Sequence, residues 1–305
     1  MAYKPHKIVR EKIAKKEDRK KFWQIFLIEG SLFFLTSILS VISAFQLNNL
    51  VKIKKIYLPA ISAQDFVFSF LFIAFFILFF VSFKKAARFK ELIYKGLFIL
   101  TVFWGGMTVL NLWIPVFGAV LAMGVLIILW LEKPSVWAHD LLMILGLAGA
   151  ASFFGLGFEP SIIVILLVAF SFYDFIAVYK TKHMIKMAKE MIEKKVVLGF
   201  IIPKKIKYFK DKLTNVKPGG NFFILGGGDV VFPNLLAVSV VPSGILKALT
   251  IIIFSLVGSL FSYWLFANQK DPLTGSGQSN EPIPALPPVA LFAIVGYFIS
   301  LLLPL

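Results

Sequence analysis

Cysteine is absent from the chain of 305 residues, and histidine occurs only three times. Without cysteine, disulfide bonds and thiolate metal sites are excluded. His6 and His183 fall in polar segments and His139 stands alone in an apolar one, so the spaced ligands that a metal site needs are missing. We therefore expect no metal, and nothing in the sequence calls for another cofactor.

Charged residues are scarce as well. Asp, Glu, Lys and Arg make up 16% of the chain, whereas soluble domains have roughly 25%. Hydrophobic residues make up 59%, 34 residues are phenylalanine, and the mean hydropathy is +0.86. This composition indicates an integral membrane protein, in which a spanning helix of about 20 residues is the unit of structure.

Nine apolar segments are long enough to cross a bilayer as helices. We place them at 23–45, 66–83, 96–111, 113–131, 136–156, 161–179, 222–241, 248–267 and 286–304. They lack the two-residue alternation of barrel strands, so their backbone groups must be satisfied within helices. We predict an all-α fold, a polytopic bundle of nine transmembrane helices. It forms a single membrane domain, with six helices in residues 1–179, a basic loop at 180–221 and three helices in 222–305.

Negative charge is the scarcer sign, with 16 Asp and Glu against 32 Lys and Arg, a net charge of +16. If alternate loops lie on opposite sides of the membrane, 28 of the basic residues fall on the amino-terminal side and 4 on the other. The positive-inside rule then predicts a cytoplasmic N-terminus and an external C-terminus, in the cell membrane if the source is prokaryotic. Anionic lipid headgroups explain the basic excess, so we expect the lipid bilayer and no nucleic acid as a partner.

The longest polar segment, 180–221, carries Met184, Met187 and Met191 at helical spacing among lysines. This pattern favours a basic amphipathic helix lying on the cytoplasmic leaflet over a dedicated partner site. A second polar segment, 268–285, is rich in Gly and Pro and is expected to be mobile.

Four acidic residues lie within the predicted spans: Glu29, Asp140, Asp174 and Asp229. A charge in hydrocarbon is costly unless it is paired or faces water, so each is a candidate for function. Glu29 lies about one turn into its helix, where it can reach the headgroups or pair with a basic residue. Asp140, next to His139, lies near the cytoplasmic end of its helix, where interfacial hydrogen bonding is favoured over catalysis.

Asp174 and Asp229 are distinguished by their depth. They lie on consecutive predicted helices, and each is roughly 8 to 10 Å from the cytoplasmic boundary at a rise of about 1.5 Å per residue. Two carboxyl groups held close together share a proton, so one can accept a proton from water while the other donates one to a carbonyl oxygen. Such a dyad hydrolyses peptides by general acid–base catalysis. The alternative is that each Asp is hydrogen-bonded separately or lines an ion path.

Gly226, Gly227 and Gly228 directly precede Asp229. Three glycines weaken a helix by roughly 1 kcal/mol each relative to alanine, and they let another backbone approach closely. They are compatible with close approach of a substrate chain, and equally with the close packing of two membrane helices.

Three short motifs resemble those of one known family. Tyr173-Asp174, Gly226-Gly227-Gly228-Asp229 and Pro284-Ala285-Leu286 are similar to the YD, GxGD and PAL motifs of the presenilin and signal peptide peptidase family of intramembrane aspartyl proteases. Each motif alone is weak, but the three occur in order on the sixth, seventh and ninth predicted helices. The chain resembles a compact archaeal-type homologue that works as one intact chain.

The resemblance implies an aspartic endopeptidase in which Asp174 and Asp229 are catalytic, Tyr173 belongs to the active-site motif together with the three glycines, and Pro284–Leu286 contact the substrate. Its substrates are then transmembrane segments of membrane proteins or signal peptides. The loop between the sixth and seventh helices lacks an obvious hydrophobic cleavage segment, which argues against autoproteolytic maturation. Self-association into a homo-oligomer is left open.

The prolines also have a physical interpretation. Pro282 and Pro284 keep their segment out of a helix, whereas Pro287 and Pro288 suit the first turn of the last helix. An extended segment at 284–286 could pair with an unwound substrate by strand addition. The plainer interpretation is that the prolines mark the start of a helix.

Three other functions stay open at this point. A proton-coupled membrane transporter could use Asp140, Asp174 and Asp229 as a relay. A prepilin-type leader peptidase also uses a GxGD aspartate but lacks the PAL motif. A non-enzymatic membrane chaperone or helix-binding protein would hold substrates without cutting them.

Overall fold

The computed structural model describes residues 5–55, 64, 68, 72, 87–180, 189–194, 196–217, 220–269 and 283–303. For residues 5–21 and 87–90 the description covers the backbone alone. The predicted helix at 66–83 and most of the predicted loop at 268–285 fall outside these residues.

Helices dominate the described residues. They are α1 (Pro5–Lys54), α3 (Ala87–Leu110), α4 (Val116–Glu132), α5 (Val136–Gly157), α6 (Pro160–Phe175), α8 (Gly227–Ser239), α9 (Ile245–Asn268) and α10 (Leu286–Leu301). Five of the described helical segments are long and apolar enough to cross a membrane, and three shorter apolar helices accompany them. The mostly helical, polytopic character predicted from the sequence is therefore confirmed, while the count of nine spans stays a prediction.

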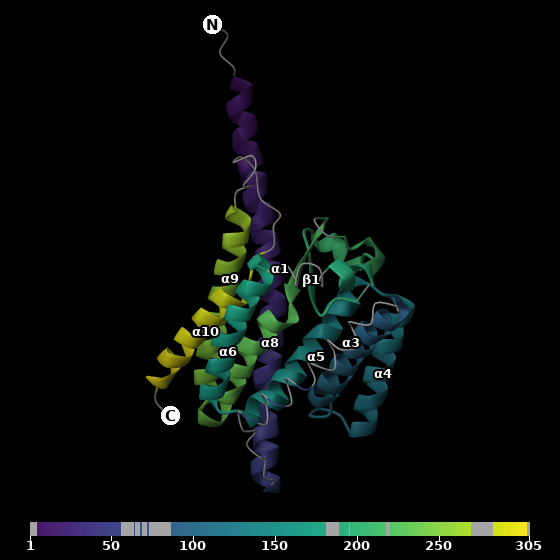
Figure 1. Cartoon of the computed structure of the whole chain (residues 1–305), viewed down its shortest axis with the longest axis vertical. Coiled ribbons are helices and arrows are strands. Elements are labelled where there is room, and N and C mark those ends of the chain that lie inside the picture. Colours follow the sequence, from purple (N-terminus) through teal and green to yellow (C-terminus); the bar gives the residue numbers. More distant parts are fainter. Residues whose placement is uncertain are drawn as a thin grey trace.

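Two groups of helices meet along α1 (Figure 1). Helices α3, α4 and α5 form one group, and α6, α8, α9 and α10 form the other, with α5 packed against α8 between them. The long helix α1 contacts α5, α8 and α9. It begins at Pro5, well before the predicted start at 23, and continues to Lys54.

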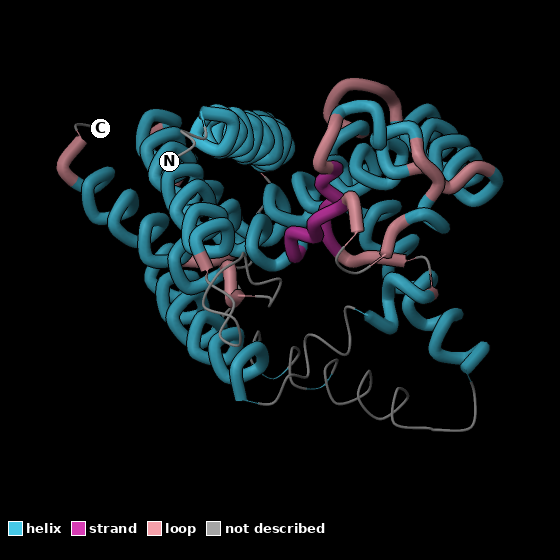
Figure 2. The backbone as a smooth tube through the Cα atoms, turned by 90° about the horizontal axis from the view of Figure 1, so that it is seen from above, coloured by secondary structure: helices cyan, strands magenta, loops and turns pink. Residues whose placement is uncertain are grey.

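The expectation of an all-helical bundle is wrong at one place. Residues Gly199–Pro203 (β1) and Phe222–Gly226 (β2) form a two-stranded antiparallel sheet, in which Gly199 pairs with Gly226 and Pro203 with Phe222. Viewed from above, the strands lie in the middle of the molecule between the helices (Figure 2). All five residues of β1 are buried, so the sheet is part of the interior.

The seventh predicted helix was placed from 222, but the helix begins only at Gly227. The four residues Phe222–Leu225 are aromatic, β-branched or bulky, which suits a strand, and the glycines after them weaken any helix that would continue backwards. The strand is tolerated here because β1 supplies the backbone hydrogen-bond partners that a helix would otherwise supply internally.

Much of the segment predicted as an amphipathic helix on the leaflet falls outside the described residues, so its orientation stays a prediction. Met191 is 8% exposed and belongs to the same hydrophobic core as Ile25 of α1, Phe98 of α3 and Phe200 of β1. Met184 and Met187 lie outside the described residues. The chain from 196 to 217 then folds against the start of α5, where the Val136 N–H donates to the Asp211 carbonyl at 3.0 Å.

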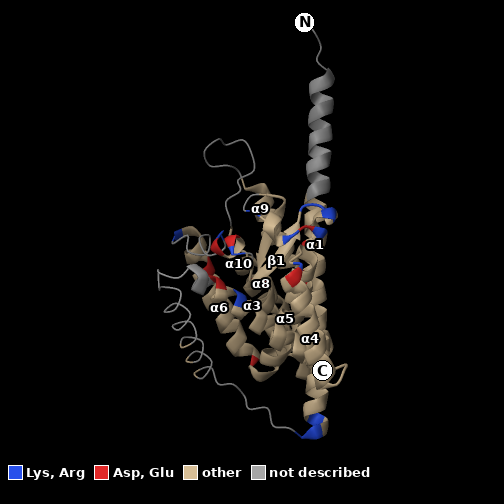
Figure 3. Ribbon diagram, turned by 90° about the vertical axis from the view of Figure 1, so that its right-hand side faces the viewer, with Lys and Arg blue, Asp and Glu red and all other residues tan. Residues whose placement is uncertain are grey.

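Charged side chains avoid the middle of the bundle. In Figure 3 the described Lys, Arg, Asp and Glu residues gather near β1 and at the far end of α1, with few between them. A band of this kind is what a bilayer requires of a spanning bundle.

Candidate active site

Asp174 lies in the last turn of α6, and a π-helical turn, Ile176–Lys180, follows directly. Its side chain is only 5% exposed. The backbone N–H of Leu286, the first residue of α10, donates to Asp174 Oδ2 at 3.3 Å. The first N–H groups of a helix have no partner within the helix, and the helix dipole favours negative charge there. The start of α10 is therefore stabilised by a carboxylate that comes from α6.

Asp229 is the third residue of α8, and Gly226 is the residue that caps this helix. The Asp229 carboxylate folds back over the helix start and accepts the backbone N–H of Gly226. A β-carbon added at Gly226 would lie 2.9 Å from Asp229 Oδ2, which is too close for any larger side chain. Glycine at 226 therefore provides the space in which this carboxylate lies.

The two carboxyl groups come from neighbouring helices, because α6 contacts α8. Asp229 is partly buried and Asp174 is buried, so water has limited access to both. Each carboxylate also lies at a helix start, that of α8 for Asp229 and that of α10 for Asp174. That the two carboxyl groups form a pair stays a prediction.

The side chain of Tyr173 points away from the buried position of Asp174. Its side chain is 54% exposed, whereas that of the adjacent Asp174 is 5% exposed, since successive helical residues point about 100° apart. Among the described residues, the Tyr173 hydroxyl has no hydrogen-bond partner. Its membership of the active-site motif, as implied by the resemblance, stays a prediction.

The segment around Pro284 reaches the site through its backbone. Pro284 and Leu286 are buried, and Ala285 has φ −88° and ψ −29°, which are helical values. The expected extended strand is thus not present at Ala285, because the helix α10 starts immediately after it. The Leu286 N–H is already used by Asp174. Contact of 284–286 with a substrate stays a prediction.

Glu29 does not reach the headgroups or a basic residue as expected. It is 5% exposed, and its Oε1 accepts the hydroxyl hydrogen of Ser259 on α9 at 2.6 Å. The sequence contains no signal for this contact, because Glu29 and Ser259 are 230 positions apart.

His139 and Asp140 are hydrogen-bonded as expected, but their partner is a buried strand and not the membrane interface. The Ile201 N–H donates to Asp140 Oδ1 at 2.9 Å. The Nε2 of His139 lies 3.0 Å from the Gly199 carbonyl oxygen, and since a carbonyl only accepts, Nε2–H is the donor. Neither residue is more than 2% exposed. In the part of the chain that the structure describes, no three His, Asp or Glu side chains are grouped so that they could hold a metal ion.

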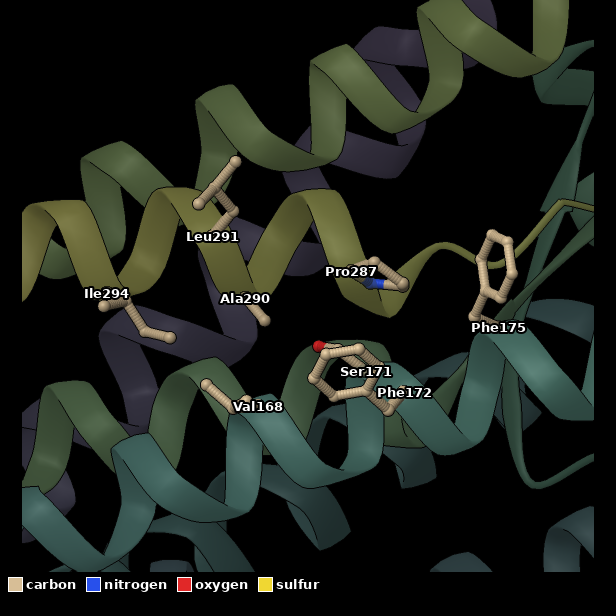
Figure 4. Close-up of a pocket in the computed structure, with 8 residues that line it drawn as sticks. All are labelled: Val168, Ser171, Phe172, Phe175, Pro287, Ala290, Leu291 and Ile294. Carbon is tan, nitrogen blue, oxygen red and sulfur yellow. The ribbon is translucent and has the colours of Figure 1, made fainter.

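An apolar pocket of about 380 Å³ lies between α6 and α10 (Figure 4). Four of its residues come from α6 and four from α10: Val168, Ser171, Phe172, Phe175, Pro287, Ala290, Leu291 and Ile294. The two helices that hold the Asp174–Leu286 contact therefore also form a cavity for an apolar group.

The fold is similar to solved structures. Two of them, each described as a presenilin family intramembrane aspartate protease, were determined in space groups C222 and P2. The first is 21% identical, with a TM-score of 0.58, covering 91% of this chain and 97% of the other. The second is 23% identical, with a TM-score of 0.55, covering 89% of this chain and 95% of the other. No curated protein matches the sequence at a significant level.

A family model described as signal-peptide peptidase, presenilin aspartyl protease matches residues 29–304. The match spans Asp174, Asp229 and the segment whose backbone N–H donates to Asp174. Since it also spans nearly the whole chain, the protein belongs to the signal-peptide peptidase and presenilin family of aspartyl proteases.

Proposed function

We propose that the protein is an intramembrane aspartyl protease of the GxGD type, which cuts peptide bonds within or near transmembrane segments of membrane proteins or signal peptides. The observation that carries this proposal is the position of Asp174 and Asp229 on two helices that contact each other inside an apolar bundle. A transporter needs polar groups along a path through the membrane, whereas these two carboxylates lie at helix ends.

The chemistry follows from one shared proton. One carboxylate takes a proton from a water molecule, whose oxygen attacks the carbonyl carbon, while the other carboxyl group donates its proton to the carbonyl oxygen. The tetrahedral product collapses when a proton passes to the amide nitrogen and the C–N bond breaks. The partly buried surroundings of Asp174 and Asp229 exclude bulk water and strengthen these interactions.

A substrate span would bind at the α6–α10 pocket. Its lining is apolar, and Leu291 and Phe172 are 61% and 68% exposed, so they face the lipid from which a substrate helix would come. The backbone at 284–286 adjoins the same place. We infer that these residues position the substrate chain after it has begun to unwind.

The topology is proposed to be N-terminus cytoplasmic and C-terminus external. Helix α1 begins and α10 ends at opposite ends of the molecule, which agrees with an odd number of crossings (Figure 1). The two aspartates then lie nearer the cytoplasmic leaflet, because the segment directly after β1 is rich in lysine: Lys204, Lys205, Lys207, Lys210 and Lys212.

The test is cleavage of a single-span peptide of known sequence by the purified protein, in detergent and then in liposomes, with fragments identified by mass spectrometry. We expect cuts inside the span from the wild type, and none from Asp174→Asn or Asp229→Asn. Glu29→Gln, which alters a buried carboxyl group outside the dyad, is the matched control and should still cut.

Each rival function predicts another result. Cutting that persists in both Asp variants would refute the dyad. Cleavage only at the end of a leader segment would favour a prepilin-type peptidase. Solute or proton flux in liposomes that is abolished by the same variants, without any fragments, would favour a transporter.

A further inference from the structure

Two adjacent polar residues of α5, His139 and Asp140, form hydrogen bonds to strand β1 in the interior of the protein. Asp140 accepts the N–H of Ile201, and His139 donates to the carbonyl oxygen of Gly199. The His139 ring is stacked on Phe98, with centroids 4.9 Å apart and planes 9° apart, so its orientation is fixed. One turn of α5 thus forms hydrogen bonds to two alternate residues of the strand, to the carbonyl oxygen of Gly199 and to the N–H of Ile201.

Strand β1 in turn holds the start of α8. Gly199 is paired with Gly226, and the N–H of Gly227, the first residue of α8, donates to the Leu198 carbonyl at 3.0 Å. A β-carbon at Gly199 would overlap the carbonyl oxygen of Leu225, so the two backbones are in the closest possible contact. The position of β1 therefore determines the position of the residues that precede Asp229.

The same face of α5 also supports α8 directly. A β-carbon at Gly227 would lie 3.4 Å from Met143 Cε and 3.6 Å from Leu147 Cδ2. Met143 and Leu147 are one and two turns beyond His139 on α5. Helix α5 therefore contacts the start of α8 twice, once through β1 and once through apolar side chains.

Stability alone does not explain this choice of residues. Burying an Asp and a His costs free energy that apolar residues of similar size would not, and no Lys or Arg in the described residues forms an ion pair with Asp140. The polar pair specifies the position of the strand, because hydrogen bonds to one N–H and one carbonyl fix the register of β1 against α5, which apolar packing does not do.

We infer that His139 and Asp140 are positioning residues for the reaction: by fixing β1, they hold the amino-terminal end of α8 so that the Asp229 carboxyl group faces Asp174. This inference rests on the proposed function. Neither residue touches the reacting atoms, so both act through the strand.

Asp140→Leu and His139→Phe test the inference in the full-length protein. Leucine fills the space without accepting a hydrogen bond, and phenylalanine keeps the stacked ring without donating one. We expect kcat per inhibitor-titrated active site to fall about 10- to 100-fold, as for a small misplacement of a catalytic group, with KM little changed. Hydrogen exchange of a peptide covering residues 222–232 should become faster. Asp140→Asn keeps an acceptor oxygen and should retain most of the wild-type kcat.

Ser152→Ala is the matched control, because Ser152 is a buried polar residue of α5 whose hydroxyl bonds to Gly149 within the helix. It should leave both kcat and the exchange at 222–232 unchanged.

A lower melting temperature with wild-type kcat per titrated site in Asp140→Leu and His139→Phe would overturn the inference, since it would mark a purely structural role. If Asp140→Leu does not accumulate, His139→Phe decides. Absence of cleavage by the wild type would instead count against the proposed function, and the exchange result would then stand alone.

Discussion

Asp229 and Asp174 are held by surroundings of different kinds. Asp229 follows a helix start that is tied to β1 by backbone hydrogen bonds and supported by α5. Asp174 precedes a π-helical turn. Among the described residues its carboxylate accepts one hydrogen bond, from the N–H of Leu286, the first residue of α10. The first carboxylate lies in a continuous hydrogen-bonded frame, and the second lies at the contact of two helix ends beside an apolar pocket.

This difference separates two tasks within one site. A frame with many hydrogen bonds resists displacement, so it suits the part that fixes the geometry of catalysis. A contact between two helix ends can open by a small movement, so it suits the part that admits a substrate. Apart from substitutions of the two aspartates themselves, changes on the Asp229 side should therefore act on kcat, and changes on the Asp174 side should act on substrate binding.

Gly226→Ala is expected to have the largest effect. The new methyl group would lie 2.9 Å from Asp229 Oδ2 and would push the carboxylate away from its place over the helix start. We expect kcat to fall about 100-fold, because a displacement of about 1 Å is enough for such a loss. The measurement is steady-state cleavage of a single-span peptide with active-site titration.

Gly228→Ala is the control in the same motif. Its added methyl group would meet only the Phe232 ring, at 3.5 Å, which is an ordinary contact. We expect kcat close to that of the wild type. Equal losses in the two variants would contradict the steric explanation and would mean that the glycines serve helix flexibility instead.

Val168→Trp tests the Asp174 side. Val168 lines the pocket and is 43% exposed, so an indole at this position would fill the pocket without entering the core. We expect KM for a single-span substrate to rise about tenfold, equivalent to about 1.4 kcal/mol of binding, while kcat is retained. Ile165→Trp on the same helix is the control, because Ile165 is 68% exposed and does not line the pocket. A fall in kcat with unchanged KM would refute the division of tasks.

The helices were predictable because each one follows from its own residues. The runs of apolar residues mark α5, α9 and α10 to within a few positions, and Asn111 and Pro115 mark the turn between α3 and α4. The depths of Asp174 and Asp229 were also predictable, since depth along consecutive spans depends only on counting residues, while the approach of the two carboxyl groups stays a prediction.

What could not be predicted depends on distant partners. Residues 222–226 are as apolar as a spanning helix, and their strand also needs β1 as its hydrogen-bonding partner. Two buried hydrogen bonds, Ser259 to Glu29 and Ile201 to Asp140, join positions that no local sequence pattern connects. The helical backbone of Ala285 depends on the carboxylate of Asp174 at the start of α10.

Ser259→Ala should have the smallest effect of the set. It removes the hydroxyl that donates to Glu29 at 2.6 Å, in a contact between α9 and α1 that touches neither helix end of the site. Hydrogen bonds between membrane helices contribute on average about 0.6 kcal/mol and at most about 1.7 kcal/mol. A double-mutant cycle with Glu29→Ala, followed by unfolding in detergent, should give a coupling in this range. Ser259 and Glu29 belong neither to the frame around Asp229 nor to the helix contact at Asp174. We therefore expect kcat to change much less than in Gly226→Ala, and KM much less than in Val168→Trp. A large loss of kcat in Ser259→Ala would make Glu29 part of the frame that holds Asp229.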